Sequence, residues 1–200
     1  TDDADEEVAD DLLASVATLE IANIGRTVES LDRRHFSKVS ETLFASDRVH
    51  TFGMGISAML AELAAYTLLQ VGLRAWCLST SFSSPREQLV GVGPKDVVMV
   101  ISLPPYSKQS LEILRDARSL EIPTVAISDR LTSPASGLAR LALPVKSDNM
   151  MFTNAVAAVT VLINALATEI AATHREEALT ALAKINRVLT EDDDLLPARR

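Results

Sequence analysis

The side chains best suited to chemistry are serines, threonines and glycines in four short segments, each of which follows an apolar run. These segments are 53–57, 79–84, 102–107 and 128–133. Glycine lets the backbone approach an anion, and helix-starting N–H groups with neutral hydroxyls hold a phosphate without a buried counter-charge. A single serine says little, because serine often caps a helix. Four such segments together predict a site for a phosphorylated small molecule.

Eight residues of these segments make up the predicted ligand site: Gly53, Gly55, Ser57, Ser81, Ser83, Ser102, Tyr106 and Ser107. The segments follow predicted parallel strands, whose carboxyl ends meet at one edge of the sheet, where ligands bind. We therefore expect the eight residues to line one pocket at that edge. Within it, Ser57 and Ser107 are expected to contact the anionic group.

Sites for cofactors and metals are poorly supported. Gly53 and Gly55 begin a G-x-G-x-x-G pattern with Ala58 at its third position, a weak signal for a dinucleotide. The second predicted strand ends in Leu78-Ser79-Thr80, with no acid to bind a ribose, and the chain has no G-x-x-x-x-G-K-[ST] motif. There is also no H-x-H, C-x-x-C or H-E-x-x-H motif for a metal. We expect no cofactor and no metal.

Candidates for acid–base catalysis are few. An aldose–ketose isomerase needs a base, normally Glu or His, to move a proton between adjacent carbons. His50 lies in or beside the first predicted strand, where a structural role is favoured, and His35 is expected to be exposed before the second helix. His174 could reach a neighbouring subunit's site, although an exposed position at a helix end is favoured. Glu87 is explained by a capping box, and Glu62 is explained by a position on the surface of a helix. We therefore predict no catalytic residue.

Hydrophobic periodicity indicates the elements that position these residues. Short apolar runs without polar alternation, typical of strands covered on both faces, occur at 49–52, 75–78, 97–101, 124–127 and 141–145. Helical segments lie between them, near 56–71, 85–91, 107–120 and 134–138. This alternation predicts an α/β fold: a parallel sheet with right-handed crossovers and helices on both faces, a three-layer sandwich.

Further helices precede and follow this unit, at about 5–30, 36–45, 152–172 and 175–189. The first is long and amphipathic. The segment 152–172 is long enough to span a membrane, but its polar residues favour a helix buried on the sheet or against a partner subunit. These residues are Thr153, Thr160, Asn164, Thr168 and Glu169. We divide the chain into an acidic linker and connecting helix (1–30), one domain (31–190) and a tail (191–200).

Composition restricts the classes of function. The formal net charge is −8, but acidic residues concentrate at 2–11 and 191–194, so the body between them is nearly neutral. No cluster of Lys and Arg forms a stripe, which gives DNA binding by this chain little electrostatic support. The single Cys77 allows no internal disulfide, and the sequence does not begin with an apolar secretory leader. We expect a cytoplasmic protein that binds no membrane.

The motifs resemble a known family. TFGMGIS before an Ala-rich helix, and the run from MVISLPPYSKQS through SDRLTSP to LALPV, look like those of the sugar isomerase (SIS) domain. The Tyr106-Ser107 pair and the SDRLTSP turn are most similar to the version in RpiR-type (MurR/RpiR) transcription regulators. The resemblance covers about 47–172. It implies a flavodoxin-like five-stranded parallel sheet, dimers, phosphosugar recognition at the strand ends, and DNA binding through an N-terminal helix-turn-helix domain that this sequence lacks.

The loop after the third strand departs from the pattern S-x-S-G-x-T of the family's phosphate site. Ser102 and Ser107 match its hydroxyl positions, but Pro104 and Pro105 replace its second Ser and its Gly. Prolines have no N–H, so the amides of residues 106–108, the two hydroxyls and the Lys108 ammonium remain to hold a phosphate. A related variant of the regulators has an Arg where Pro105 stands. We expect weakened phosphate binding or a ligand other than a simple sugar phosphate.

Two main functions remain open. The favoured one is an effector-binding and dimerisation domain that senses a phosphorylated sugar or sugar derivative and signals through helix 5–30 to a DNA-binding domain. The alternative is a stand-alone sugar-phosphate isomerase, which should retain a credible base. A third possibility, which the Pro104-Pro105 pair keeps open, is a dimerisation module without a ligand. The expected partners are a phosphosugar, a second copy of the chain in a homodimer or higher oligomer, and DNA only through the missing domain.

Overall fold

The computed structural model describes residues 2–79, 81, 83–150 and 154–191 of the 200-residue chain. Its centre is a five-stranded parallel sheet with the strand order β2-β1-β3-β4-β5. The strands are β1 (Val49–Phe52), β2 (Ala75–Cys77), β3 (Val97–Ser102), β4 (Thr124–Ser128) and β5 (Leu141–Pro144). The predicted fold class, an α/β sandwich with a five-stranded parallel sheet, is confirmed.

The strands form where the sequence has unbroken apolar runs because both faces of the sheet are covered. Every residue of β3 and β4 is buried. Side chains alternate between two cores along β3: Met99 and Ile101 join one, Val98 and Val100 the other. In the register of the sheet Phe52 pairs with Val100, so β1 and β3 end side by side at the centre of the sheet.

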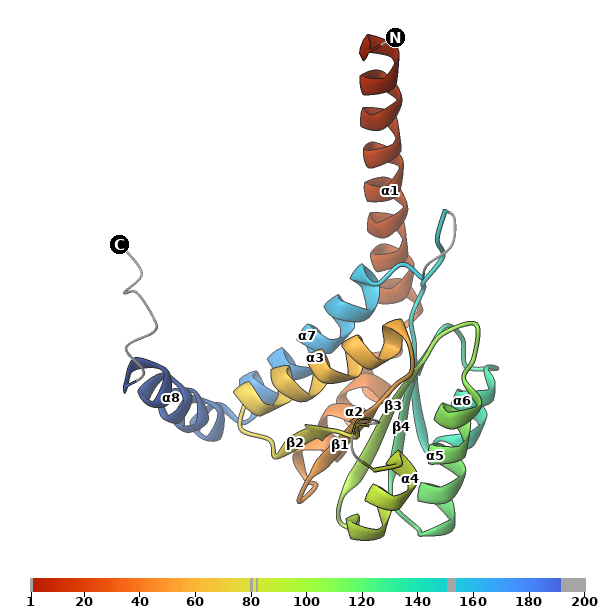
Figure 1. The fold of residues 1–200 in the computed structure, drawn as a ribbon. Coiled ribbons are helices and arrows are strands. Elements are labelled where there is room, and N and C mark those ends of the chain that lie inside the picture. The colour runs from red at the N-terminus through yellow and green to blue at the C-terminus, as the bar shows by residue number, and fades with distance from the viewer. Residues whose placement is uncertain (1, 80, 82, 151–153, 192–200) are drawn as a thin grey trace.

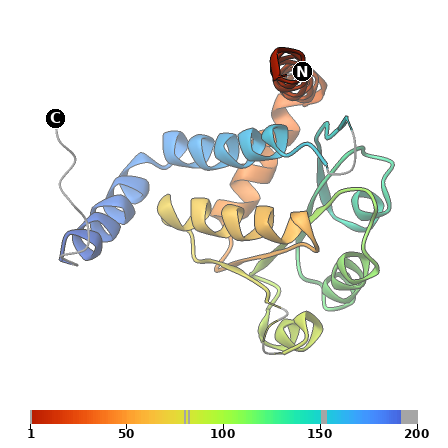
Figure 2. The same cartoon turned by 45° about the horizontal axis from the view of Figure 1, so that its top comes forward.

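Helices cover both faces of the sheet, as Figures 1 and 2 show. The first core lies under α2 (Arg33–Phe44), α3 (Ile56–Gln70) and α7 (Ala157–Thr173). The second core lies under α4 (Pro85–Gln88) with the 3₁₀ turn Leu89–Gly91, α5 (Lys108–Ser119) and α6 (Pro134–Leu138). The last helix, α8 (Arg175–Glu191), follows α7.

The predicted helix caps are present. Ser84 and Glu87 form a reciprocal capping box at α4, and the Ser133 hydroxyl accepts from the Ser136 amide at α6. Asp32 caps α2 by accepting from the His35 amide at 2.7 Å, so this helix begins three residues earlier than its apolar pattern indicates. A carboxylate at an N-cap satisfies amides that have no partner within the helix.

The helix α1 (Asp2–Ser30) forms as predicted but rests on the body only near its end, and its first half extends away in Figure 1. Ile24 packs against the first core beside α7, whereas the apolar residues Leu12, Val16 and Val28 of the same helix are exposed. The body therefore covers only part of the apolar surface of α1.

The apolar segment predicted as a helix over 152–172 begins later, at Ala157. Residues 154–156 are not helical, because two hydrogen bonds to distant residues hold them. The Asn154 amide group donates to the Pro104 carbonyl at 2.6 Å, and the Val156 amide donates to Glu20 Oε1 at 3.3 Å. The predicted start was wrong because apolar composition does not reveal such contacts; positions 151–153 lie outside the described residues.

Within the described parts of the chain, no single helix is long and apolar enough to cross a membrane. The pair α7 and α8 passes the same criteria only when joined, and the two helices meet at a bend of 112°.

Candidate functional site

The candidate site lies where β1 and β3 end. These neighbouring strands are followed by helices on opposite faces of the sheet, α3 after β1 and α5 after β3, which is the arrangement at which open α/β sheets bind ligands. Because Phe52 pairs with Val100, Ser102 lies level with the turn that follows β1. Residues 53–57 and 102–107 are thereby brought together.

The turn after β1 needs its glycines for two different reasons. A Cβ atom on Gly53 would clash with the carbonyl group of Ser57, so only glycine lets the turn pack this tightly on α3. Gly55 has φ 60° and ψ −130°, a backbone conformation that side chains disfavour. The buried Ser57 donates its amide to the Met54 carbonyl at 3.2 Å, which closes the turn.

The helices that follow β1 and β3, α3 and α5, both lack a side-chain cap. Gly55, the N-cap of α3, has no side chain, and the hydroxyl of Ser107, the N-cap of α5, makes no capping hydrogen bond. In contrast, Ser84 and Ser133 cap the short helices α4 and α6. The first amides of a helix have no acceptor within it and carry partial positive charge. Two uncapped helix N-termini that lie beside each other favour the binding of an anion.

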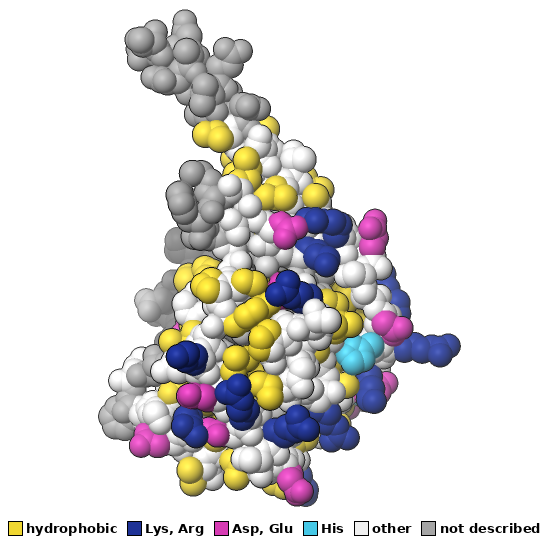
Figure 3. All heavy atoms as spheres, turned by 90° about the vertical axis from the view of Figure 1, so that its right-hand side faces the viewer, with side chains coloured by type: hydrophobic (Ala, Val, Ile, Leu, Met, Phe, Trp, Pro, Cys, Tyr) yellow, Lys and Arg dark blue, Asp and Glu magenta, His cyan; other side chains and the backbone are white. Residues whose placement is uncertain are grey.

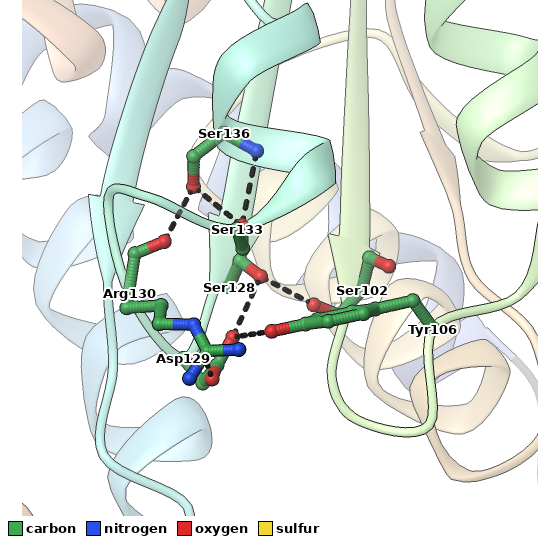
Figure 4. Close-up of polar contacts among 7 residues, drawn as sticks. All are labelled: Ser102, Tyr106, Ser128, Asp129, Arg130, Ser133 and Ser136. Atoms are coloured by element: carbon green, nitrogen blue, oxygen red, sulfur yellow. Dashed lines mark hydrogen bonds and ion pairs between the residues drawn. The ribbon is translucent and has the colours of Figure 1, made fainter.

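Ser102 adds a second indication of a ligand. The residue is 3% exposed, and its hydroxyl has no hydrogen-bond partner among the described residues. Its carbonyl accepts from the Ser128 hydroxyl at 2.6 Å, while Figure 4 shows the Ser102 hydroxyl turned away from Ser128. A buried polar group without a partner costs about 1–3 kcal/mol. A ligand that hydrogen-bonds to Ser102 would recover this cost.

The side chain of Tyr106 lies beside the end of β4 rather than over β1 (Figure 4). Its hydroxyl donates to Asp129 Oδ1 at 2.7 Å, and the Ser128 hydroxyl lies 3.3 Å from the same oxygen. Arg130 Nε is 3.6 Å from Asp129 Oδ2. Burial raises the pKa of Tyr106, the hydrogen bond to Asp129 raises it further, and Arg130 opposes both effects. Tyr106 therefore remains a neutral donor at physiological pH.

The model of the SIS domain family matches residues 42–169. The chain belongs to the SIS domain family. No curated protein sequence matches this SIS domain significantly.

Among solved structures, the SIS domain is similar to the sugar isomerase domain of an RpiR transcription factor from Sphaerobacter thermophilus, with TM-score 0.84, 26% identity, and coverage of 88% of this chain and 98% of that one. The domain is also similar to NanR of Vibrio vulnificus, complexed with ManNAc-6P, with TM-score 0.82 and 16% identity. That match covers 96% of this chain and 74% of NanR. A phosphoheptose isomerase from Francisella tularensis matches with TM-score 0.67 and 19% identity, over 80% of this chain and 96% of the isomerase. Regulators and isomerases thus both share the fold.

The SIS domain brings together five of the eight predicted site residues, those in the turn after β1 together with Ser102 and Ser107 after β3. Tyr106 belongs to the same loop but directs its side chain to Asp129. Ser83 is half-buried and Ser81 exposed in the segment after β2, where positions 80 and 82 lie outside the described residues. A single pocket lined by all eight residues stays a prediction.

Asp129 and Arg130 were missed as site residues. The segment 128–133 was recognised only by its hydroxyls, and the acid and base directly after a strand were the available signal. Glu20 was missed as well: this residue of α1 accepts from the Val156 amide, and its Oε2 atom is buried without a partner among the described residues. Nothing in the sequence near Glu20 indicates that contact, because 136 positions separate the two residues.

Two of the three histidines were predicted to be exposed, and neither is, although the predicted position of His174 at the end of a helix is confirmed. His35 is half-buried within the first turn of α2, with Nε2 2.9 Å from the Ala142 carbonyl oxygen. His174, also half-buried, stacks on Phe44 with 3.4 Å between ring centroids. Both rings join helices to the rest of the SIS domain, which explains their burial.

The remaining candidates for catalysis are placed as predicted or nearly so. His50 lies in β1, where burial lowers its pKa although Asp96, 3.9 Å away, acts in the opposite direction. Glu87 serves the capping box, and Glu62 is exposed on α3. Cys77 is half-buried, and burial raises its pKa. Within the described residues no group of three or more His, Cys, Asp or Glu side chains could hold a metal ion.

Proposed function

We propose that this SIS domain is the effector-binding and dimerisation domain of a transcription regulator, and that its effector is a phosphorylated sugar or sugar derivative. One observation carries the proposal: α3 and α5 begin uncapped at adjacent strand ends, beside the buried and unpartnered hydroxyl of Ser102. Helix amides and neutral hydroxyls are suited to a phosphate group. Pro104 and Pro105 contribute no amide, so the start of α5 bears most of that role.

Two further observations support a sensor over an isomerase. The RpiR domain is similar over nearly its whole length, and the NanR structure is complexed with ManNAc-6P, a phosphorylated sugar derivative. Within the described residues, the segments after β1, β3 and β4 contain no Glu or His that could move a proton on a bound sugar. Hydroxyl groups, Lys108, Asp129 and Arg130 line these segments instead, which suits binding.

Isothermal titration calorimetry with a panel of sugar phosphates, including ManNAc-6P, tests the ligand. At least one phosphosugar should bind, and the same sugar without phosphate should not. Ser107→Ala should weaken binding about tenfold, the effect of losing a hydrogen bond to a charged group. Ser119→Ala is the matched control, because Ser119 lies at the other end of α5 and bonds only to the Asp116 carbonyl. A wild-type domain that binds none of the panel contradicts the proposal.

Turnover and DNA binding test the class of function. Incubation with hexose and pentose phosphates should give no aldose–ketose conversion; conversion that Glu87→Gln or His174→Gln abolishes would establish the isomerase instead. The domain alone should bind duplex DNA weakly, because few phosphates could be neutralised by a nearly neutral body. In Figure 3 basic side chains are interspersed with acidic and hydrophobic ones. Tight, salt-sensitive DNA binding by this chain would contradict the assignment.

A further inference from the structure

We propose that Asp129 and Arg130 bind the sugar end of the ligand and determine which phosphosugar the domain accepts. The inference rests on the proposed function and adds a specificity site to it. Both residues follow β4 directly, at the same edge of the sheet as Ser102, and Tyr106 joins them to the loop after β3 (Figure 4).

The position of Tyr106 separates the two ends of the ligand. Its backbone directly precedes Ser107 and the uncapped start of α5, where the phosphate is expected. Its hydroxyl, at the far end of the side chain, contacts Asp129. A phosphate held at the start of α5 therefore leaves the rest of the ligand to extend along Tyr106 toward Asp129 and Arg130.

The carboxylate of Asp129 is oriented with one oxygen still able to accept. Oδ1 is occupied by the hydroxyls of Tyr106 and Ser128. Among the described residues Oδ2 pairs only with Arg130, at 3.6 Å, which is beyond hydrogen-bond distance. The backbone around it is fixed too, because the Arg130 carbonyl accepts from the Ser136 hydroxyl at 2.9 Å and the Ser133 amide at 3.1 Å. Such an arrangement is built before any ligand arrives.

The guanidinium of Arg130 lies beside Asp129 and the Tyr106 hydroxyl, in contacts that a ligand can replace. Its side chain is 60% exposed, and a loose exposed pair with Asp129 contributes little, so ligand groups can replace it at small cost. Together the two side chains offer an acceptor and several donors with no net charge. This chemistry matches sugar hydroxyls or an acyl oxygen, which donate or accept hydrogen bonds without charge, better than it matches a second anionic group.

Calorimetry with two probes separates sugar recognition from phosphate recognition: the tightest-binding phosphosugar of the panel, and glycerol 3-phosphate, which lacks a sugar ring. Asp129→Asn and Arg130→Gln should each weaken phosphosugar binding about tenfold, the scale of one lost charged hydrogen bond. Both variants should leave glycerol 3-phosphate binding unchanged. Ser107→Ala should weaken both probes. Arg140→Gln removes the same charge at the start of β5, at the opposite edge of the sheet, and should change neither.

Thermal unfolding of each variant identifies any loss that comes from misfolding, and Arg130→Lys provides a milder change at the same position. Equal losses for both probes would make Arg130 a phosphate ligand and overturn the inference. Unchanged phosphosugar binding in both variants, with the expected loss in Ser107→Ala, would overturn it while the proposed function stands. If wild-type protein binds no phosphosugar, the proposed function fails and the inference fails with it.

Discussion

At the scale of single residues, Gly53 is the position where one added carbon should disturb the site most. Gly53→Ala would place a methyl group against the backbone of Ser57, which cannot move without shifting the start of α3. We expect a loss of about 1–3 kcal/mol in unfolding free energy, typical of overpacking. Thermal unfolding followed by circular dichroism should show a lower Tm by roughly 2–4 °C per kcal/mol.

Gly25→Ala is the control, because nothing lies within 4 Å of its added carbon and it stands inside α1. Alanine there should stabilise the helix by up to about 1 kcal/mol. A Gly53→Ala protein that unfolds like wild type would show that the turn after β1 is not tightly packed on α3.

Tyr106 gives a prediction for pH dependence. The folded protein holds the phenol proton more tightly than the unfolded chain, because burial and Asp129 raise its pKa. Its contribution to stability is therefore complete below the ordinary tyrosine pKa of about 10 and is lost as the pH rises through the higher folded value. In a Tyr66→Phe background, absorbance titration of Tyr106 should show a midpoint above that of free tyrosine, and Asp129→Asn should lower it. An unchanged midpoint would contradict the contact in Figure 4.

Sequence could identify some site residues and not others for a physical reason. Ser102 and Ser107 were predictable because Ser102 ends a strand whose position is fixed by its apolar residues, and Ser107 ends the loop after that strand. The role of Asp129 depends on Tyr106, 23 positions earlier, which reaches it only because β3 and β4 are neighbours in the sheet. Local pattern predicts which side chains stand at a sheet edge, but not which of them contact each other.

At the scale of elements, α1 is fastened to the segment that connects β5 to α7. Asn23 donates to the Asp148 carbonyl at 2.8 Å, Arg26 pairs with the Asp148 carboxylate at 2.8 Å, and the Lys146 amide donates to Thr27 at 2.8 Å. The far end of the same segment contacts the site loop, where Asn154 bonds to Pro104. This is the physical connection through which a ligand could affect α1.

Asn23→Ala should loosen this connection. Asn23 is fully buried, and its replacement removes two hydrogen bonds, one to the Asp148 carbonyl and one from Arg26, each worth about 0.5–1.5 kcal/mol. Hydrogen exchange should become faster in the part of α1 near Asn23 and in residues 146–148, and stay unchanged in β3. Thr18→Ala is the control, since the Thr18 hydroxyl bonds only to its own helix at Ala14. Equal protection of α1 in wild type and Asn23→Ala would refute the connection.

The elements themselves were largely predictable. All five strands were predicted to within a residue or two, because a buried parallel strand must be apolar on both faces and the turns after it are polar. The start of α7 was not predictable, because Asn154 and Val156 form hydrogen bonds with Pro104 and Glu20, which are distant in the sequence. Tertiary hydrogen bonds at the ends of an element override its composition.

At the scale of the whole molecule, α3 and α7 lie side by side over the first core (Figure 2). Their inward residues are buried against the sheet, yet large apolar side chains also lie on the outer surface: Ile56, Met59, Tyr66, Leu69 and Val161. Large apolar side chains exposed on two adjacent helices are typical of an interaction surface. The expected homodimer would cover it.

We therefore expect the chain to dimerise through α3 and α7. Sedimentation velocity at micromolar concentration should show a dimer, and Met59→Glu with Leu69→Glu should convert it to a monomer, because charged side chains would have to be buried in the interface. Met59 is 66% exposed and contributes little to the core, so the folded subunit should survive the change.

Val90→Glu provides the control: this residue is 87% exposed, lies over the opposite face of the sheet, and should leave the dimer intact. A wild-type protein that sediments as a monomer would contradict the dimer, and a dimer unaffected by both substitutions would move the interface to another surface, such as the exposed apolar residues of α1.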